Sequence, residues 1–570
     1  MMKRLFAFTK PYAKSRNILF FLVVLRSIQL PLLAWMTGAI INQVIVHGKV
    51  DLLFVSCLGF LAFAIFTDVT FSFRMVLAMN LGESVIRDLR LAVFRHMQSM
   101  RMAAFHRTKV GRIISRFTSD AEAVRVGIQD VLFVSLVQAG QMMVAAALMA
   151  FYDIGLFLVI LVLVPVYWLI NRQFSHRLAK AHREVQESFS RITSSLAEAV
   201  NGIRVTQGFV RQDVNSAVFA SLVQDHAKVS MKVAKTSGTF IPLLEFNSQI
   251  FIAILLVLGG WQVIHTETTV TVGDLIQFFF LANLFFSPIQ SLGNQYNNAL
   301  NALAGAERLF AFLDTKPDWV EPDGISDLPK INGHVRFHDV TFSYKPAEPV
   351  LHGISFAVEP GWSVALVGHT GSGKTSIINL LAKFYLPDSG QVFIDGHDIL
   401  AIRAESLQRQ IGMVLQQNFL FSGTILENIR FSRPEATEDE VAEVLHSLDC
   451  DDLFESLPEG LLTELGERGA GLSLGQRQLL CFARAMLADP RILILDEATS
   501  AIDTITEVRL QKATKNLLAG RTSFVVAHRL STVRDADLLL ILDHGKLVQS
   551  YRRGEKGFAD YIRKNHAMVL

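Results

Sequence analysis

Six long apolar segments occupy the first half of this 570-residue chain, and they limit its possible folds more than any other feature. Each is long enough to cross the hydrocarbon core of a bilayer, which is about 30 Å thick. Backbone polar groups in that core must bond to one another, so we expect helices. A hydrophobic content of 51% and a mean hydropathy of +0.35 exclude a wholly soluble protein. The predicted spans are residues 17–41, 52–78, 130–152, 154–174, 239–264 and 274–297.

Lysine and arginine are unevenly distributed among the connections between these spans. The arm before residue 17 carries five of them, and the long stretches 79–129 and 175–238 are rich in both, whereas the short connections contain only Lys49. Basic residues favour the cytoplasmic side, so we predict that both termini and both long stretches are cytoplasmic. The arm 1–16 mixes aromatic and basic residues, which indicates an element lying on the membrane surface. Little more than Asp153 separates the third span from the fourth, where we expect a hairpin.

A glycine-rich loop in the second half of the chain has the residues needed to hold phosphate groups. It follows an apolar strand, 363–367, and precedes a helix that begins near Ser376. Its glycines allow consecutive backbone N–H groups to point at phosphate oxygens. Lys374 is predicted to reach the β and γ phosphates of ATP, and Thr375 to bind Mg²⁺. The predicted ATP contacts in this loop are Gly368, His369, Thr370, Gly371, Ser372, Gly373, Lys374, Thr375 and Ser376.

Two carboxylates end a second apolar strand, Arg491 to Asp496. Buried parallel strands deliver such groups to their carboxyl ends. Asp496 suits Mg²⁺, directly or through water, and contact with ATP. Glu497, one residue later, can polarise the water that attacks the γ-phosphate.

Between these motifs lies Leu472-Ser-Leu-Gly-Gln476, and with it the chain resembles an ATP-binding cassette (ABC) transporter. The resemblance implies a signature motif that contacts the ATP held by the partner subunit in a dimer. Its contacts would be Ser473, Leu474, Gly475 and Gln476, with Leu474 standing where the family usually has glycine. Asp503 resembles the loop that connects the two ATP sites.

Other motifs carry the same resemblance at family-typical intervals. Tyr344 is similar to the aromatic residue that stacks on adenine, and Gln416 to the glutamine that senses Mg²⁺ and the attacking water. His528 resembles the switch histidine at the γ-phosphate, so Glu497, His528 and Gln416 form the implied catalytic set. Thr463 to Arg468 resembles a segment that exporters use to couple nucleotide state to the membrane helices.

The resemblance extends to the membrane half and implies an exporter-type half-transporter, like multidrug and lipid-flipping ones. Phe105 to Asp120 and Asn201 to Arg211 resemble the two loops whose short helices dock on ATPase domains. The implied fold is an α-helical six-span transmembrane domain, with long intracellular helices, fused to an α/β P-loop ATPase domain with a helical subdomain. The predicted divisions are an elbow at 1–16, the transmembrane domain at 17–313, a linker at 314–333 and the ATPase domain at 334–570.

Net charge and cysteine content give no support for a nucleic-acid-binding protein, a disulfide-rich protein or a cysteine-ligated metal protein. A net charge of +2 gives no reason to expect nucleic acid, because the basic residues lie where the membrane rule places them. The three cysteines have neither disulfide nor metal-site spacing. We expect a multi-pass protein of a bacterial cytoplasmic membrane.

The resemblance implies ATP and Mg²⁺ as cofactors and an obligatory dimer, because each ATP lies between two subunits. Homodimer and heterodimer are equally compatible with the motifs. Alternating access driven by ATP, with export or leaflet flipping of an apolar or amphipathic substrate, is the predicted function. An importer on the same fold, for example for iron chelates, is the main alternative, and an ATP-gated channel or regulatory subunit is a weaker one.

Polar residues within the spans are the candidates for substrate contact. Arg26 and Asp68 lie at comparable depths in the first two spans, and we favour their mutual pairing over a role in binding. An amphipathic cavity is predicted to include Gln138, Gln141, Glu245, Gln249 and Asn283. Hydrogen bonds between helices explain the amides equally well.

Overall fold

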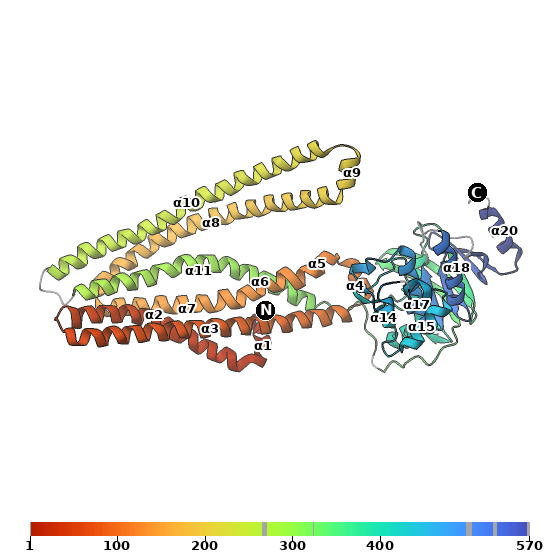
Figure 1. The fold of residues 1–570 in the computed structure, drawn as a ribbon, viewed down its shortest axis with the longest axis horizontal. Helices are drawn as coiled ribbons and strands as arrows, with labels where there is room; N and C mark the ends of the chain where they lie inside the picture. Colours follow the sequence, from red (N-terminus) through yellow and green to blue (C-terminus); the bar gives the residue numbers. More distant parts are fainter. Residues whose placement is uncertain are drawn as a thin grey trace. The chain divides into compact units, whose positions relative to one another are not determined.

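A computed structural model describes residues 2–264, 271–322, 324–455, 457–496, 504–527 and 533–566. The chain forms two compact units, each described here by itself (Figure 1). The helical unit comprises Met1–Ser99 and Lys109–Thr315, and the ATPase unit comprises Met100–Thr108 and Lys316–Leu570. The short segment Met100–Thr108 therefore leaves the helical unit and packs with residues more than 200 positions later in the chain.

Long helices build the first unit. After α1 (Met2–Phe8) and η1 (Lys10–Tyr12), the chain runs through α2 (Ala13–Ile40), η2 (Ile41–Ile45), α3 (Val50–Ser99), α5 (Val110–Ser115), η3 (Arg116–Asp120), α6 (Ala121–Val126), η4 (Gly127–Leu132), α7 (Phe133–Tyr152), α8 (Ile154–Asn201), α9 (Ile203–Gly208), α10 (Gln212–Ile264) and α11 (Val272–Leu313). α3 has 50 residues and is therefore about 75 Å long, well beyond the bilayer core.

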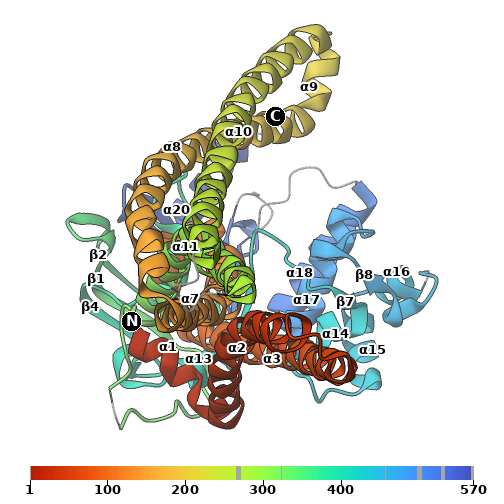
Figure 2. The ribbon, with the colours of Figure 1, turned by 90° about the vertical axis from the view of Figure 1, so that its left-hand side faces the viewer.

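All six predicted spans lie within these helices, which confirms their helical character. Among the described residues, four stretches are long and apolar enough to cross a membrane: Lys10–Ile45, Val50–Ser99, Val110–Tyr152 and Val272–Ile289. α8 and α10, which contain the fourth and fifth predicted spans, run side by side and are joined by α9 (Figures 1 and 2).

The predicted break at Asp153 is confirmed. The residue is extended, with φ −150°, and its Oδ1 accepts a hydrogen bond of 2.8 Å from the backbone N–H of Leu156. This bond caps the first turn of α8, where backbone donors have no partner within the helix. The chain therefore ends α7 and starts a separate helix within one residue.

Two glycines allow α2 and α11 to approach closely. A Cβ added to Gly38 would lie 2.8 Å from the Cβ of Gln277, and one added to Gly273 would lie 2.2 Å from Oδ1 of Asn42. Asn42 uses this space, because its Oδ1 accepts from the N–H of Gly273 at 2.9 Å and its Nδ2 donates to Asp274 at 2.9 Å. The end of the first span and the start of the last are thereby joined.

The predicted pairing of Arg26 with Asp68 is confirmed only as an electrostatic interaction, and no direct ion pair joins the two among the described residues. Nη1 of Arg26 donates instead to the backbone carbonyl of Thr67 at 2.8 Å, and its guanidinium lies 5.0 Å from the ring centre of Phe71. A main-chain carbonyl is a nearer acceptor than the exposed carboxylate one residue later. Arg74 was absent from the candidates although it falls within the predicted second span; it is buried and lies 5.3 Å from the same ring.

A buried carboxylate joins α11 to the segment after α5. Asp120 is only 3% exposed, and it accepts hydrogen bonds from Arg116 at 2.7 Å and from Arg308 at 2.5 Å. Each arginine is partly exposed, so the carboxylate, which has lost its water, depends on both for its hydrogen bonds.

Replacing Asp120 by Asn is expected to destabilise the helical unit by about 1–2 kcal/mol, because charge-assisted bonds to two arginines are lost. The melting temperature of the purified protein in detergent is expected to fall by roughly 2–6 °C. Glu122→Gln is the matched control. It removes an exposed carboxylate paired with Arg125 and is expected to change the melting temperature little. Equal shifts for the two variants would contradict this account of Asp120.

The ATPase unit contains two main sheets. The first has the order β2-β1-β4-β5 and the second β12-β11-β3-β10-β9-β6, with a short pair β7-β8. Their bounds are β1 (Val335–Lys345), β2 (Glu348–Val358), β3 (Ser363–Val367), β4 (Ser389–Ile394), β5 (His397–Asp398), β6 (Ile411–Val414), β7 (Gly423–Thr424), β8 (Glu464–Leu465), β9 (Ile492–Asp496), β10 (Thr522–Val526), β11 (Leu538–Asp543) and β12 (Lys546–Arg552). In the second sheet the neighbours from β11 to β6 are parallel.

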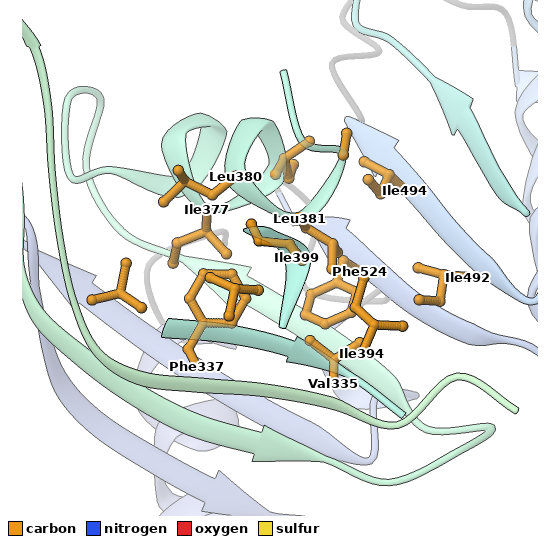
Figure 3. Close-up of a cluster of buried hydrophobic side chains, with 14 of the residues drawn as sticks. Val335, Phe337, Ile377, Leu380, Leu381, Ile394, Ile399, Ile492, Ile494 and Phe524 are labelled. Atoms are coloured by element: carbon orange, nitrogen blue, oxygen red, sulfur yellow. The ribbon is translucent and has the colours of Figure 1, made fainter. Parts of the chain in front are cut away.

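Helix α12 (Lys374–Leu381) supplies apolar side chains to the core between the sheets. Ile377, Leu380 and Leu381 meet Phe337 and Phe524, and all are essentially inaccessible to solvent (Figure 3). β3, β9 and β10 are largely buried along their length, as expected for parallel strands covered on both faces. The core therefore fixes the loop between β3 and α12.

A second core belongs to the predicted helical subdomain. It brings together α14 (Ile425–Arg430), α15 (Glu438–Ser447), α16 (Asp451–Glu455) and α17 (Leu474–Leu487), with Phe454 and Phe482 fully buried. The remaining helices are α4 (Met102–Arg107), α13 (Ala404–Gln408), α18 (Thr504–Leu518) and α20 (Lys556–His566). The predicted fold class, a helical membrane domain fused to an α/β ATPase domain, is confirmed.

Candidate nucleotide site

The glycine-rich loop has the predicted strand-loop-helix setting, between β3 and α12. Gly371 and Gly373 have φ of 84° and 101°, which side chains rarely adopt. A Cβ added to Gly373 would lie 2.6 Å from a methyl group of Leu351, and one on Gly368 would lie 2.2 Å from the carbonyl oxygen of Leu542. Glycine is therefore required by both backbone conformation and close packing.

Lys374 lies folded against this loop. Its Nζ donates to the carbonyls of Gly368 at 2.7 Å and His369 at 3.0 Å, and the residue is only 8% exposed. Burial lowers the pKa of Lys374, while the negative charge of Asp496 acts in the opposite direction. The adjoining Thr375 is exposed at the first turn of α12, where N–H groups and the helix dipole favour an anion.

The parallel register brings other predicted residues to the same edge of the sheet. Asp496 ends β9 beside Val526 of β10, and Val526 pairs with Leu366 of β3, just before the loop. Gln416 is exposed two residues after β6, which pairs with β9. The predicted Glu497, Asp503 and His528 lie outside the described residues.

Oxygen donors suited to Mg²⁺ are therefore available, in the Thr375 hydroxyl, the Asp496 carboxylate and the Gln416 amide.

Tyr344 lies against the helix that follows the loop. Its hydroxyl oxygen accepts hydrogen bonds from Ser376 at 3.1 Å and from Asn379 at 3.0 Å. Its ring meets that of Tyr385 edge-on, with centres 5.1 Å apart. The aromatic residue predicted for adenine is thus attached directly to α12.

Helix α4, from the long stretch 79–129 that is predicted to be cytoplasmic, docks beside this aromatic pair within the ATPase unit. Nδ1 of His106 lies 2.5 Å from the hydroxyl of Tyr385, and Ala103 belongs to the main apolar core. Burial is the main cause that raises the pKa of Tyr385 to about 12, so it remains a neutral hydroxyl at physiological pH. Arg107 also forms an ion pair of 2.6 Å with Asp318.

The linker residue Trp319 strengthens this docking. The guanidinium of Arg101 lies 4.0 Å from the Trp319 ring centre, and the ammonium of Lys383 lies 5.3 Å from it. Lys383 is 2% exposed and donates to the carbonyl of Ile402, and burial lowers its pKa. Both cations also lie 3.9 Å from Glu321. These cation–π contacts join residues far apart in the sequence, and no sequence motif predicted them.

The predicted signature residues form the start of α17. Oγ of Ser473 accepts from the N–H of Gln476 at 3.2 Å, and Oε1 of Gln476 accepts from the N–H of Ser473 at 2.9 Å. This reciprocal capping box explains the Ser-x-x-Gln spacing through local structure. Leu474 is 37% exposed and Gly475 is buried, so the motif presents Ser473 and Leu474 outward.

Arg484 is a residue that the motifs did not reveal. From α17 its guanidinium donates to the carbonyls of Asn428 at 2.9 Å and Phe419 at 3.0 Å, and to Oδ1 of Asn428 at 3.0 Å. It therefore joins the helix after the signature to the segment after Gln416. An arginine within the apolar second half of α17 could have suggested such a buried fork.

The predicted substrate residues do not gather around one described cavity. Gln138 and Gln141 of α7 donate to Ser291 at 2.8 Å and to the carbonyl of Leu284 at 3.2 Å, so they join α7 to α11. Asn283 donates at 2.9 Å to the carbonyl of Phe279, within its own helix. Gln249 is exposed on α10, and the side chain of Glu245 lies outside the described residues. These contacts agree with hydrogen bonding in and between helices.

A P-loop ATPase unit joined to long apolar helices defines an ATPase of the membrane. Comparisons agree: the family model for the ABC transporter transmembrane region matches residues 17–289, and the ABC transporter model matches residues 351–500. The ABC transporter ATP-binding protein YknV of Bacillus subtilis is 37% identical over 96% of this chain and 91% of its own length. An ATP-dependent lipid A-core flippase of Syntrophus aciditrophicus is 33% identical, with 85% and 81% covered.

A fatty acid ABC transporter ATP-binding/permease protein of Mycobacterium bovis is 35% identical, over 87% of this chain and 76% of the relative. A solved bacterial Atm1-family ABC exporter with ATP bound has a TM-score of 0.76 and 25% identity, covering 97% of this chain and 96% of its own. The chain belongs to the ABC transporter family. It is a bacterial membrane protein that binds ATP, works as a dimer and couples ATP hydrolysis to export or flipping.

Tyr385→Phe is expected to loosen α4 without disturbing the sheets, because it removes one partly buried hydrogen bond but keeps the ring. A loss of about 1 kcal/mol corresponds to roughly fivefold faster hydrogen exchange in residues 102–107. Mass spectrometry of exchanged peptides measures this. Tyr551→Phe on β12 is the control and should leave α4 unchanged. Unaltered exchange in the Tyr385 variant would show that the hydrogen bond does not hold the helix.

Proposed function

We propose that the protein moves a lipid-like amphipathic molecule from the cytoplasmic leaflet outward, by alternating access of a dimer. The observation that carries this proposal is the docking of α4 into the ATPase core. The chain enters α4 from α3 and leaves it into α5, so a displacement of the core pulls on two membrane helices at once. Relatives described as a lipid A-core flippase and a fatty acid transporter support the class of substrate.

The proposed domain division is the elbow at 1–16, the transmembrane domain at 17–313, the linker at 314–333 and the ATPase domain at 334–570. The distribution of basic residues supports cytoplasmic termini and ATPase domain, in the cytoplasmic membrane.

Lys374 and the loop amides would bind the ATP phosphates, and Tyr344 would stack on adenine. Thr375, Gln416 and Asp496 would hold Mg²⁺, which supplies charge neutralisation at the γ-phosphate. Glu497 would accept a proton from the attacking water, with His528 at the γ-phosphate. The nearness of Lys374 to Asp496, evident from their electrostatic interaction, supports this grouping.

Both α9 and the signature residues would contact the partner subunit. α9 and the residues around it expose Val200, Ile203, Val205, Phe209 and Val210, each by 46% or more. Such a cluster at the end of a helical pair is suited to bury itself against another protein surface. Ser473, Leu474, Gly475, Gln476 and Asp503 would contact the ATP of the other subunit. The intact Glu497 and His528 support a homodimer, and Leu474 in the signature suits a heterodimer.

ATP can drive the change only if it binds the closed dimer better than the open one. Closure would place each ATP between one glycine-rich loop and the other signature, adding contacts that the open state lacks. Hydrolysis removes those contacts and allows the dimer to reopen.

Glu497→Gln is expected to abolish steady-state ATP hydrolysis, by at least about 100-fold, while ATP is still bound. A neutral amide of the same size cannot accept the proton of water. Phosphate release and equilibrium binding of labelled ATP measure the two effects. Asp535→Asn, an exposed change in the same unit, is the control. Normal turnover in the Glu497 variant would overturn its proposed role.

The wild-type chain expressed alone in lipid nanodiscs is expected to hydrolyse ATP as a dimer, with at least about twofold stimulation by a long-chain amphiphile, because bound substrate favours closure. ATPase rates and native mass measure this. An inactive monomer would indicate a missing partner subunit. Stimulation by polar solutes alone, or accumulation in the import direction, would contradict the proposed substrate and direction.

A further inference from the structure

An apolar cavity of about 310 Å³ lies inside the helical unit, beneath the N-terminal elbow. Its walls come from the elbow, α2, α3, the η4–α7 segment and α11, with Leu5, Phe20, Leu81, Val131 and Ala299 among them. Its volume is roughly twice that of an engineered apolar cavity of about 150 Å³ that stays dry and takes up benzene. A water molecule would find almost no partners there, so an apolar group is the suitable occupant.

Small residues create this space. Gly127 and the three alanines Ala299, Ala302 and Ala306 line it. A Cβ on Gly127 would lie 2.4 Å from that of Ala302, so the two helices already touch at this point. The hollow beside this contact remains because no large side chain fills it.

One ion pair and one hydrogen bond to a carboxylate hold the elbow over the cavity. Arg4 forms bonds of 2.6 and 2.9 Å with Asp314 after α11, and the hydroxyl of Tyr12 donates to Asp88 of α3 at 2.7 Å. The elbow is thus a fixed wall rather than a loose arm.

Arg16 is the only cationic residue among those lining the cavity, and it has no carboxylate partner among the described residues. It donates to neutral groups, Thr9 at 3.2 Å and Asn17 at 3.3 and 3.4 Å, and it is half-buried. The neighbouring Arg4 already has its carboxylate. A half-buried guanidinium with only neutral partners favours an anion, because charge-assisted bonds are the stronger ones.

We propose that this cavity holds an acyl chain of an anionic phospholipid of the cytoplasmic leaflet, with its phosphate at Arg16. Arg16 directly precedes the first predicted span. This position corresponds to the depth of the lipid headgroups. The positive charge of Arg16 thus suits the phosphate of the lipid, and the apolar lining suits its acyl chain. The inference rests on the proposed orientation of the protein in the membrane. Its test measures lipid binding rather than transport, so the lipid proposal can fail while the proposed transport function stands, and the transport function can fail while the lipid proposal stands.

The test is a titration of the full-length dimer in detergent with phosphatidylglycerol or phosphatidylcholine of the same chains, followed by native mass spectrometry. The wild type is expected to bind its first phosphatidylglycerol at least about fivefold more tightly than phosphatidylcholine. Arg16→Gln is expected to remove that preference. Lys14→Gln is the matched control: it removes an exposed elbow cation outside the cavity and should change the preference by less than about twofold.

Ala299→Phe fills the cavity from its half-buried edge and is expected to weaken both lipids about equally. An unchanged preference in Arg16→Gln, or an equal loss in Lys14→Gln, overturns the proposal. If Ala299→Phe leaves lipid binding intact but separates the subunits, the cavity is a subunit contact and the proposal also fails.

Discussion

The ATPase core holds a helix that comes from the membrane half of the chain, and in the proposed mechanism the coupling of ATP hydrolysis to transport would depend on this contact. Ala103 contributes apolar area, His106 a hydrogen bond to Tyr385, and Arg107 an ion pair with Asp318. Because Tyr385 also contacts Tyr344, whose hydroxyl bonds to α12, the docking site adjoins the helix that begins with Lys374. A shift of the glycine-rich loop and its helix therefore has a short path to α4.

The sheet explains why the nucleotide residues meet although they are far apart in sequence. Parallel strands end at a common edge, and the register places Val526 beside the strand that leads into the loop, with Asp496 beside Val526 on the next strand. The capping box of Ser473 and Gln476 shows that a residue of the predicted signature motif also has a structural role. The same hydroxyl that would donate to a phosphate in the partner also accepts a backbone N–H and starts α17.

The sequence was sufficient for the helical character of the six predicted spans, for the fold class and for the glycine-rich loop, because each rests on a local signal: apolar length, strand-loop-helix order or glycine spacing. It failed where the outcome depends on which neighbour is nearest. Arg26 prefers a main-chain carbonyl to Asp68, a choice decided by distance within a helix pair. Two other contacts join residues from distant segments: Trp319 lies against Arg101 and Lys383, and the guanidinium of Arg484 bonds to Asn428. The roles of Glu497 and His528 stay predictions.

Some polar side chains within the helical unit, such as Gln138 and Gln141, bond to neighbouring helices, and others, such as Asn283, bond within their own helix. An amide that already holds two helices together is costly to redirect toward a substrate, since its partner would lose a bond in a medium without water. Recognition of the proposed lipid-like molecule would therefore fall to apolar surface and, among the described residues, to cations such as Arg16 that have only neutral hydrogen-bond partners. Exposed apolar side chains lie at α9 and along α8 and α10, and in the proposed dimer a second subunit would cover part of this surface.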